Sequence, residues 1–323
     1  MRAVLAVALM ALGCAAASAQ EAWKPVKNVE VIAGVSAGGN MDLTARSIQA
    51  IFQKKKLIPA TSTVVNKPGG GQALGLQYVK SHQGDPHYLS INSEPLLTNR
   101  IAGRSPIDFR DFTPIAHLFN EYVVFTVRAD SPLKSGKELL AKLKSDPGSV
   151  TTAVGAALGN VNHIALALLM SDVNADVKKV KIPVFNSIGE SITALLGGHV
   201  DLVIATVASV VAQMSAGKVK VLAVMAPQRL GGAMASVPTW RELGHDVTFS
   251  SFRVVVGPNG LTPQQVVYWD QVFSTLVITD EWKVDMERFQ WVPNYLNSAK
   301  TGEFLRAKDQ ELRRVYAEIG MAK

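Results

Sequence analysis

Two glycine-rich segments hold the groups best suited to bind a ligand. The first is Ser36, Ala37, Gly38, Gly39 and Asn40, and the second is Pro68, Gly69, Gly70 and Gly71. Each follows a short apolar stretch typical of a strand and precedes a stretch with helical periodicity. Backbone N–H groups at a helix start lack partners within the helix, and glycines let a ligand approach them closely. The two segments together therefore predict a seat for an anion.

The first segment also allows an enzymatic interpretation. Residues 34–38 read Gly-Val-Ser-Ala-Gly, which matches the G-x-S-x-G nucleophile elbow and makes a secreted serine hydrolase using Ser36 the alternative. That elbow normally follows several strands, whereas this one follows the first expected strand. No zincin, P-loop or dinucleotide-binding motif is present in the sequence. We therefore expect a binding protein with no catalytic residue, cofactor or metal.

Several polar residues near expected helix starts are further candidates. Asp42 could pair with Arg46 four residues on, or it could face the ligand. His163 lies close to Asn160 at the start of an expected helix, although a lone histidine usually has a structural role. Ser93 and Thr206 each follow or end an expected strand, where they could reach a cleft. We include all of these, except Arg46, as candidate ligand-binding residues.

Strands and helices alternate along the chain, which predicts an α/β fold with a parallel sheet between helices. Expected strands include 29–33, 63–65, 88–92, 122–127, 150–154, 182–185, 200–205, 219–225 and 252–257. Ser135 with Glu138, Ser187 with Glu190 and Thr262 with Gln265 carry the signals of helix starts. No flexible linker is visible, so two domains would have to be joined by crossing strands. We expect the first crossing at 122–127 and the return between 221 and 252.

The first nineteen residues read as a secretory signal peptide that ends at an A-x-A cleavage site. The only cysteine, Cys14, lies inside it, and lipidation of Cys14 is the rival interpretation. No later stretch has the ~20 apolar residues that a membrane-spanning helix needs. The net charge of +7 comes from dispersed basic residues without interleaved aromatics, so we expect no nucleic-acid binding.

The sequence resembles the solute-binding proteins of tripartite tricarboxylate transporters, also called the Bordetella uptake gene (Bug) family. Segments 36–46 and 66–71 carry the resemblance. Supporting segments follow in order at 195–201, 216–224, 237–239 and 257–258. The likeness extends over essentially the whole chain after the expected leader.

The resemblance implies a periplasmic, type II two-domain clamshell, in which each domain is a mixed, mainly parallel sheet flanked by helices. Domain 1 would comprise residues 20–123 and 247–323, and domain 2 residues 124–246. The implied function is capture of a small di-, tri- or aromatic carboxylate by a monomer. The implied partner is a membrane permease of two integral subunits. A sensor role, in which the loaded protein signals to a membrane receptor, is the alternative that keeps the fold.

The resemblance also implies ligand loops in the second domain. These contribute Gly159, Asn160 and His163, and then Asn186 and Ser187. The chain departs from the usual family pattern in four places: Gly34-Val35 precedes the first glycine turn, Gln72 ends the second, the second-domain loop has fewer Ser and Gly residues, and Asn186 replaces a frequent Lys or Gly. These departures affect the identity of the ligand more than the fold.

Overall fold

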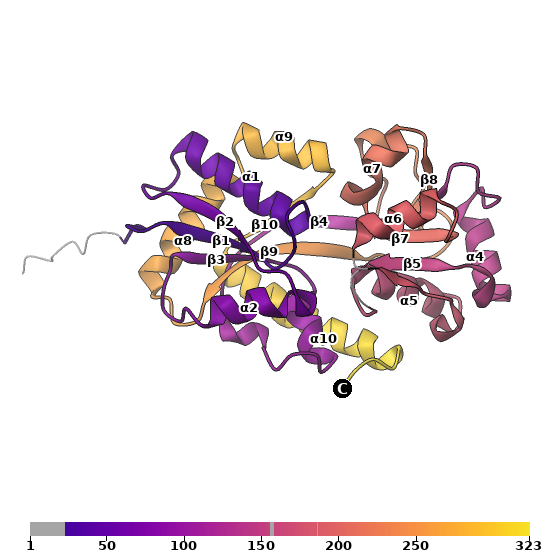
Figure 1. Cartoon of the computed structure of the whole chain (residues 1–323), viewed down its shortest axis with the longest axis horizontal. Coiled ribbons are helices and arrows are strands. Elements are labelled where there is room, and N and C mark those ends of the chain that lie inside the picture. The colour runs from indigo at the N-terminus through magenta and orange to yellow at the C-terminus, as the bar shows by residue number, and fades with distance from the viewer. Residues whose placement is uncertain (1–22, 156–157, 186) are drawn as a thin grey trace, which may run out of the picture.

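A computed structural model describes residues 23–155, 158–185 and 187–323, so the expected leader, Cys14 and Asn186 lie outside the described residues. Its helices and strands form two groups that lie side by side, with β4 and β9 running between them (Figure 1). Within the described part of the chain, no helix is long and apolar enough to cross a membrane.

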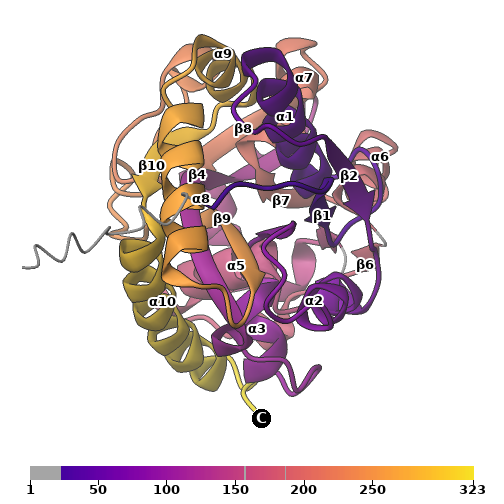
Figure 2. The same ribbon diagram turned by 90° about the vertical axis from the view of Figure 1, so that its left-hand side faces the viewer.

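The first group is a six-stranded sheet with helices on both faces. Its parallel strands are β1 (Val29–Ala33), β2 (Ser62–Asn66) and β3 (Tyr88–Asn92), and its antiparallel strands are β9 (Ser250–Pro258), β4 (Phe112–Arg128) and β10 (Val292–Leu296). The helices are α1 (Asn40–Lys55), α2 (Ala73–Lys80), α3 (Pro95–Ile101), α8 (Pro263–Leu276), α9 (Asp280–Phe289) and α10 (Ser298–Glu318). Helices α1 and α9 lie on one side of the sheet, and α2 and α3 lie on the other (Figure 2).

The second group continues the same sheet. It contains β5 (Thr152–Gly155), β6 (Val184–Phe185), β7 (Leu202–Thr206) and β8 (Val219–Val224). Helices α4 (Gly136–Ser145), α5 (Val161–Asp172), α6 (Ile188–Leu196) and α7 (Val207–Ser215) cover it. Short 3-10 turns complete the described structure: η1 (Gly70–Gln72), η2 (Phe109–Asp111), η3 (Pro147–Ser149), η4 (Val177–Lys179) and η5 (Gly232–Met234).

Strand β4 connects the two groups because it exchanges partners along its length. From Phe112 to Tyr122 it pairs with β9, and from Val123 onward it pairs with β7. Strand β10 also pairs with the part of β4 before Tyr122, and β8 pairs with the part from Val124 to Arg128. The strand therefore begins ten residues before the expected start at Tyr122, and it carries the chain across at that residue.

The local start signals explain several helices. Thr262 and Gln265 form a complete capping box at α8, as the sequence predicts. Ser135 and Ser187 each accept the backbone N–H three residues on, which caps α4 and α6. Asn160 caps α5, with its Oδ1 accepting the N–H groups of Asn162 and His163.

Candidate ligand-binding site

The first glycine turn connects β1 to α1 and is largely exposed at Ser36, Ala37 and Gly38. Gly39 donates its N–H to the carbonyl of Ser36 over 3.1 Å, which closes the turn. Gly39 is also the N-cap residue of α1, and no side chain caps this helix. The positive end of α1 is therefore left open toward the turn.

Asp42 holds the first turn in shape. Its buried carboxylate accepts the N–H of Gly38 over 2.8 Å, Nε of Arg46 over 2.8 Å and Nδ2 of Asn66 over 2.9 Å. Burial on its own raises the pKa of this carboxyl group, but the hydrogen bonds from Arg46, Gly38 and Asn66 outweigh it and hold the pKa below the ordinary value. All of these contacts of Asp42 are with residues of the first group of elements.

The second glycine turn has an unusual backbone. Gly69, Gly70, Gly71 and Gln72 all have positive φ angles, of 130°, 56°, 59° and 78°. Glycine adopts such angles freely, whereas a residue with a Cβ does not. Nδ2 of Asn99, on α3, donates to the carbonyl of Gly71 over 2.8 Å. This bond holds the turn against α3.

The two turns pack directly against each other. A Cβ added to Gly34 would lie 2.9 Å from Cβ of Gln72, and one added to Gly75 would lie 3.0 Å from Cα of Gly34. Contacts this short would push the neighbouring segments apart, so the glycines allow the end of β1 to touch the start of α2. Together with the bond from Asn66 to Asp42, this packing makes the turns one unit.

Several amides of this unit remain open. Gly38 and Gly39 use their N–H groups internally, as described above. In contrast, the N–H groups of Asn40, Gly69 and Gly70 have no hydrogen-bond partner among the described residues. Pro68, the exposed residue before Gly69, has no N–H to contribute. The open amides of the two turns can stabilise a negative charge.

The second group of elements reaches this site through β7 and α7. Nδ2 of Asn40 lies 3.2 Å from Oγ1 of Thr206 and 3.5 Å from Oγ of Ser209. Thr206 ends β7 and is buried, so this contact places the carboxyl end of β7 opposite the start of α1. The structure thus brings together two of the sequence candidates, Asn40 from the first group and Thr206 from the second.

Gly159, Asn160 and His163 make mainly internal contacts. Gly159 donates its N–H to Nδ1 of His163 over 2.9 Å, and Asn160 caps α5. Burial lowers the pKa of His163 to about 4, and the charge of Arg104 adds to this effect. The imidazole is therefore neutral at pH 7, which fits its role as an acceptor.

The remaining candidates also have local roles. Ser93 is buried, and its carbonyl accepts the N–H of Leu96. Ser187 is exposed and caps α6. Gly155 lies beside the start of α6, where an added Cβ would stand only 2.6 Å from the nitrogen of Ile188. The binding roles expected for Ser93 and Ser187 remain predictions.

The hydrolase interpretation requires a strained, positive-φ serine at the elbow. Ser36 is not among the positive-φ residues of the described chain, and the contact seen for it is the turn bond from Gly39 to its carbonyl. The described residues also contain no group of three or more His, Cys, Asp or Glu side chains that could hold a metal ion. Ser36 therefore lacks the backbone geometry of a nucleophile elbow.

Sequence reasoning missed several residues that shape the site. Asn66 was part of a recognised segment, but its bond to Asp42 joins positions 24 residues apart and has no local signature. Asn99 lies on α3, a helix that the sequence analysis did not identify. Gln72 departs from the family pattern, and its positive φ continues that of the three glycines before it, which are the one local signal for this conformation.

Comparison with known proteins identifies the family. Residues 44–320 match the model of the TctC family, described as tripartite tricarboxylate transporter family receptor. The chain is 28% identical over 327 residues to the "UPF0065 protein in gbd 5'region" of Cupriavidus necator, covering 100% of this chain and 97% of that protein.

Solved structures show the same fold. A TctC solute-binding protein from Polaromonas is 26% identical, with a TM-score of 0.71 over 91% of this chain and 99% of that one. MatC of Rhodopseudomonas palustris, solved with bound malate, is 23% identical, with a TM-score of 0.75 over 93% and 100%. A further R. palustris protein, solved with adipate, is 20% identical, with a TM-score of 0.83 over 92% and 99%. The chain belongs to the TctC family of tripartite tricarboxylate transporter receptors, and it is a solute-binding protein with the type II periplasmic-binding-protein fold, not an enzyme.

Proposed function

We propose that the protein captures a small carboxylate, such as a dicarboxylate, between its two groups of elements and delivers it to a two-subunit membrane permease. The amides of Asn40, Gly69 and Gly70 would receive one carboxylate of the ligand. This proposal is supported by the open N–H groups of two adjacent turns, one of which is the uncapped start of α1. Relatives of the same fold were solved with malate and with adipate.

The proposed seat uses backbone dipoles in place of cationic side chains. Arg46, the nearest arginine in sequence, is already paired with Asp42. The ammonium group of Lys67 lies over the ring of Tyr78, 4.3 Å from its centroid. An anion held by aligned amides needs no buried counter-ion and can be released without breaking a salt bridge.

We further propose that the two groups are domains that close over the ligand by bending at the crossing strands. The division would be residues 20–123 with 247–323, and residues 124–246. The exchange of β4 partners between Tyr122 and Val123 supports this division. The hydrogen bond from Asn40 to Thr206 would then form as the domains approach. We place the protein in the periplasm, in agreement with the expected signal peptide.

Two substitutions at Asn40 test the amide seat. Asn40 is the first residue of α1, where proline is tolerated, and Gly39 before it has ψ of 160°, which suits a residue that precedes proline. Asn40→Ala removes the side chain but keeps the N–H, whereas Asn40→Pro removes both. Thermal shifts with malate and with adipate should be smaller for Asn40→Pro than for Asn40→Ala.

The comparison isolates one backbone hydrogen bond to a charged group, which contributes about 1.5–3 kcal/mol. Equal affinity of the two variants would show that this amide does not hold the ligand. If no member of a wider carboxylate panel shifts the wild-type melting temperature, while sugars or amines do, the proposed ligand class is wrong.

A further inference from the structure

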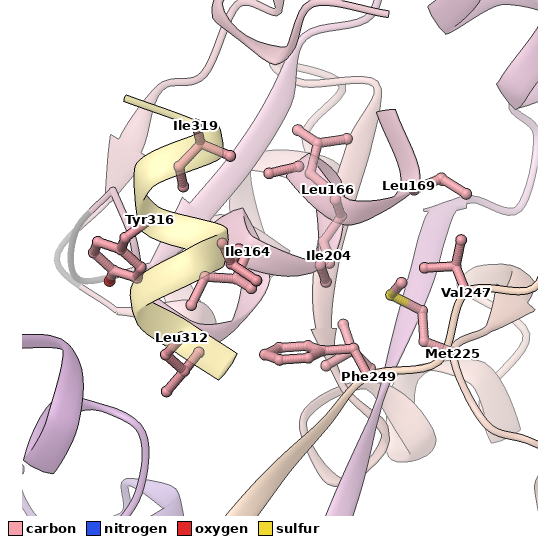
Figure 3. Packing of buried hydrophobic residues seen from close by; sticks show 14 of the residues in the cluster. Ile164, Leu166, Leu169, Ile204, Met225, Val247, Phe249, Leu312, Tyr316 and Ile319 are labelled. Atoms are coloured by element: carbon pink, nitrogen blue, oxygen red, sulfur yellow. The ribbon is translucent and has the colours of Figure 1, made fainter. Parts of the chain in front are cut away.

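The end of α10 lies against the second group of elements, although the helix starts in the first. Leu312, Tyr316 and Ile319 share one buried cluster with Ile164 of α5 (Figure 3). The C-terminus correspondingly lies at the junction of the two groups (Figure 1). Besides β4 and β9, this helix is therefore a third structural connection across the junction.

Two side chains of the first group bind consecutive carbonyls of the loop before α5. Nη2 of Arg104 donates to the carbonyl of Leu158 over 2.8 Å, and the hydroxyl of Tyr316 donates to the carbonyl of Gly159. Gly159 has φ of 77°, and an added Cβ would lie 2.6 Å from Nη2 of Arg104 and 2.7 Å from the hydroxyl of Tyr316. A side chain at this position would displace one of these two groups, and the positive φ also favours glycine.

The same loop is held from its other side by its own helix. The N–H of Gly159 donates to Nδ1 of His163, and Asn160 caps α5. Both backbone polar groups of Gly159 are thus bonded, one to each half of the protein. A movement that separates the loop from the first group has to break the bonds to Arg104 and Tyr316.

Tyr316 is firmly attached to the first group. The N–H of Lys323 donates to the carbonyl of Ile101 over 3.0 Å, which ties the chain end to α3. Burial raises the pKa of the Tyr316 phenol, and the nearby side chains of Thr98 and Arg104 partly offset the rise. Both of these residues precede the crossing at Tyr122, so the phenol is oriented by the first group.

We infer that Tyr316 and Arg104 are positioning residues that fix the loop at Leu158 and Gly159 to the first domain, so that this part of the second group is already held in place when a ligand arrives. The inference rests on the proposed function for its role in ligand binding. Its structural part, the attachment of the loop, does not depend on any ligand.

Hydrogen exchange on the ligand-free protein tests the attachment directly. Tyr316→Phe keeps the ring and removes the bond to Gly159, and we expect about 2- to 10-fold faster exchange in the peptide that contains Gly159 and Asn160. Tyr295→Phe is the matched control, because its hydroxyl donates to the carbonyl of Asp270 over 3.3 Å within the first group. Arg104→Gln, with Arg110→Gln as its control, tests the second bond in the same way.

Unchanged exchange at Gly159 in both Tyr316→Phe and Arg104→Gln would overturn the inference. Calorimetric titration with malate and with adipate tests the functional part. We expect a roughly 2- to 10-fold higher Kd for Tyr316→Phe and an unchanged Kd for Tyr295→Phe. If Tyr316→Phe lowers the melting temperature but leaves Kd unchanged, Tyr316 has only a structural role, and the inferred role in ligand binding is wrong. If neither acid binds the wild type, the proposed ligand class fails, while the exchange result still decides the attachment.

Discussion

The carboxylate of Asp42 and the side-chain amide of Asn66 join the two glycine turns, with Nδ2 of Asn66 2.9 Å from Oδ1 of Asp42. Asn66 also donates to the carbonyl of Val35, just before the first turn. One amide thus fixes the end of β2 to both ends of the β1–α1 turn. This connection fixes the open amides of the two turns relative to each other.

Asp42→Asn should therefore destabilise the protein and weaken ligand binding together. The neutral amide loses the charge on three hydrogen bonds, and its NH₂ group opposes one of the donors, so we expect a loss of about 2–4 kcal/mol in the free energy of unfolding. Urea denaturation at pH 7 measures this loss. Asp309→Asn is the control, since Asp309 pairs with Arg313 at the same helical spacing on α10.

Arg46→Gln measures how much the ion pair with Asp42 stabilises the protein, apart from the hydrogen bonds that Asp42 makes in the turn. Arg46 is half exposed, and exposed pairs contribute little, so we expect a change below about 0.5 kcal/mol in unfolding free energy. Asp42 would keep its bonds to Gly38 and Asn66. A loss as large as that of Asp42→Asn would mean that the salt bridge, and not the turn bonds, stabilises the site.

Gly155→Ala should destabilise the second group by a purely steric effect. Its Cβ would stand 2.6 Å from the nitrogen of Ile188, at the start of α6. Overpacking of this kind costs about 1–3 kcal/mol, which guanidinium denaturation resolves. Gly231→Ala adds the same methyl group where nothing lies within 4 Å, and it should leave the stability unchanged.

The sequence predicts strand–helix alternation well because most elements carry local signals. The capping box at Thr262 and the apolar stretch of β1 are examples. Strand β4 was predicted to start ten residues too late, since Pro114 and two irregularities in its pairing with β9 interrupt the pattern. Helix α3 has only seven residues, and β10 contains Pro293, so neither gives a clear periodicity.

The site was predictable in part for the same reason. Glycine turns are contiguous in sequence, and both lie where the chain predicts them. Two contacts between the groups of elements join residues that are distant in sequence: Asn40 with Thr206, and Tyr316 with Gly159. Such pairs depend on how the two groups are placed, and no spacing within one segment encodes them.

The buried ion pair on the crossing strands gives a further prediction. Arg253 of β9 and Glu121 of β4 are each about 2% exposed, and Nη2 of Arg253 donates to Oε2 of Glu121. Glu121→Gln leaves a buried guanidinium without its counter-charge, so we expect a loss of about 3–5 kcal/mol in unfolding free energy. Asp246→Asn breaks the exposed pair with Arg241 and should change little. Equal effects of the two variants would contradict the prediction.

The neutral state of His163 predicts how stability depends on pH. Burial lowers the pKa of His163 to about 4 in the folded protein, against about 6.5 in an unfolded chain. Between these values the unfolded chain binds the proton and the folded protein does not, so stability falls as the pH falls from 6.5 to 4, by about 1.4 kcal/mol per pH unit for this histidine. His117, with a pKa of about 4 from burial, adds an equal slope.

His163→Asn tests this assignment, because asparagine keeps an acceptor for the N–H of Gly159 but does not titrate. Urea denaturation at a series of pH values from 4 to 6.5 should show a slope that is smaller by the contribution of one proton. His199→Asn, at an exposed position, should leave the slope intact, and a wild-type slope in His163→Asn would show that His163 is not the group responsible.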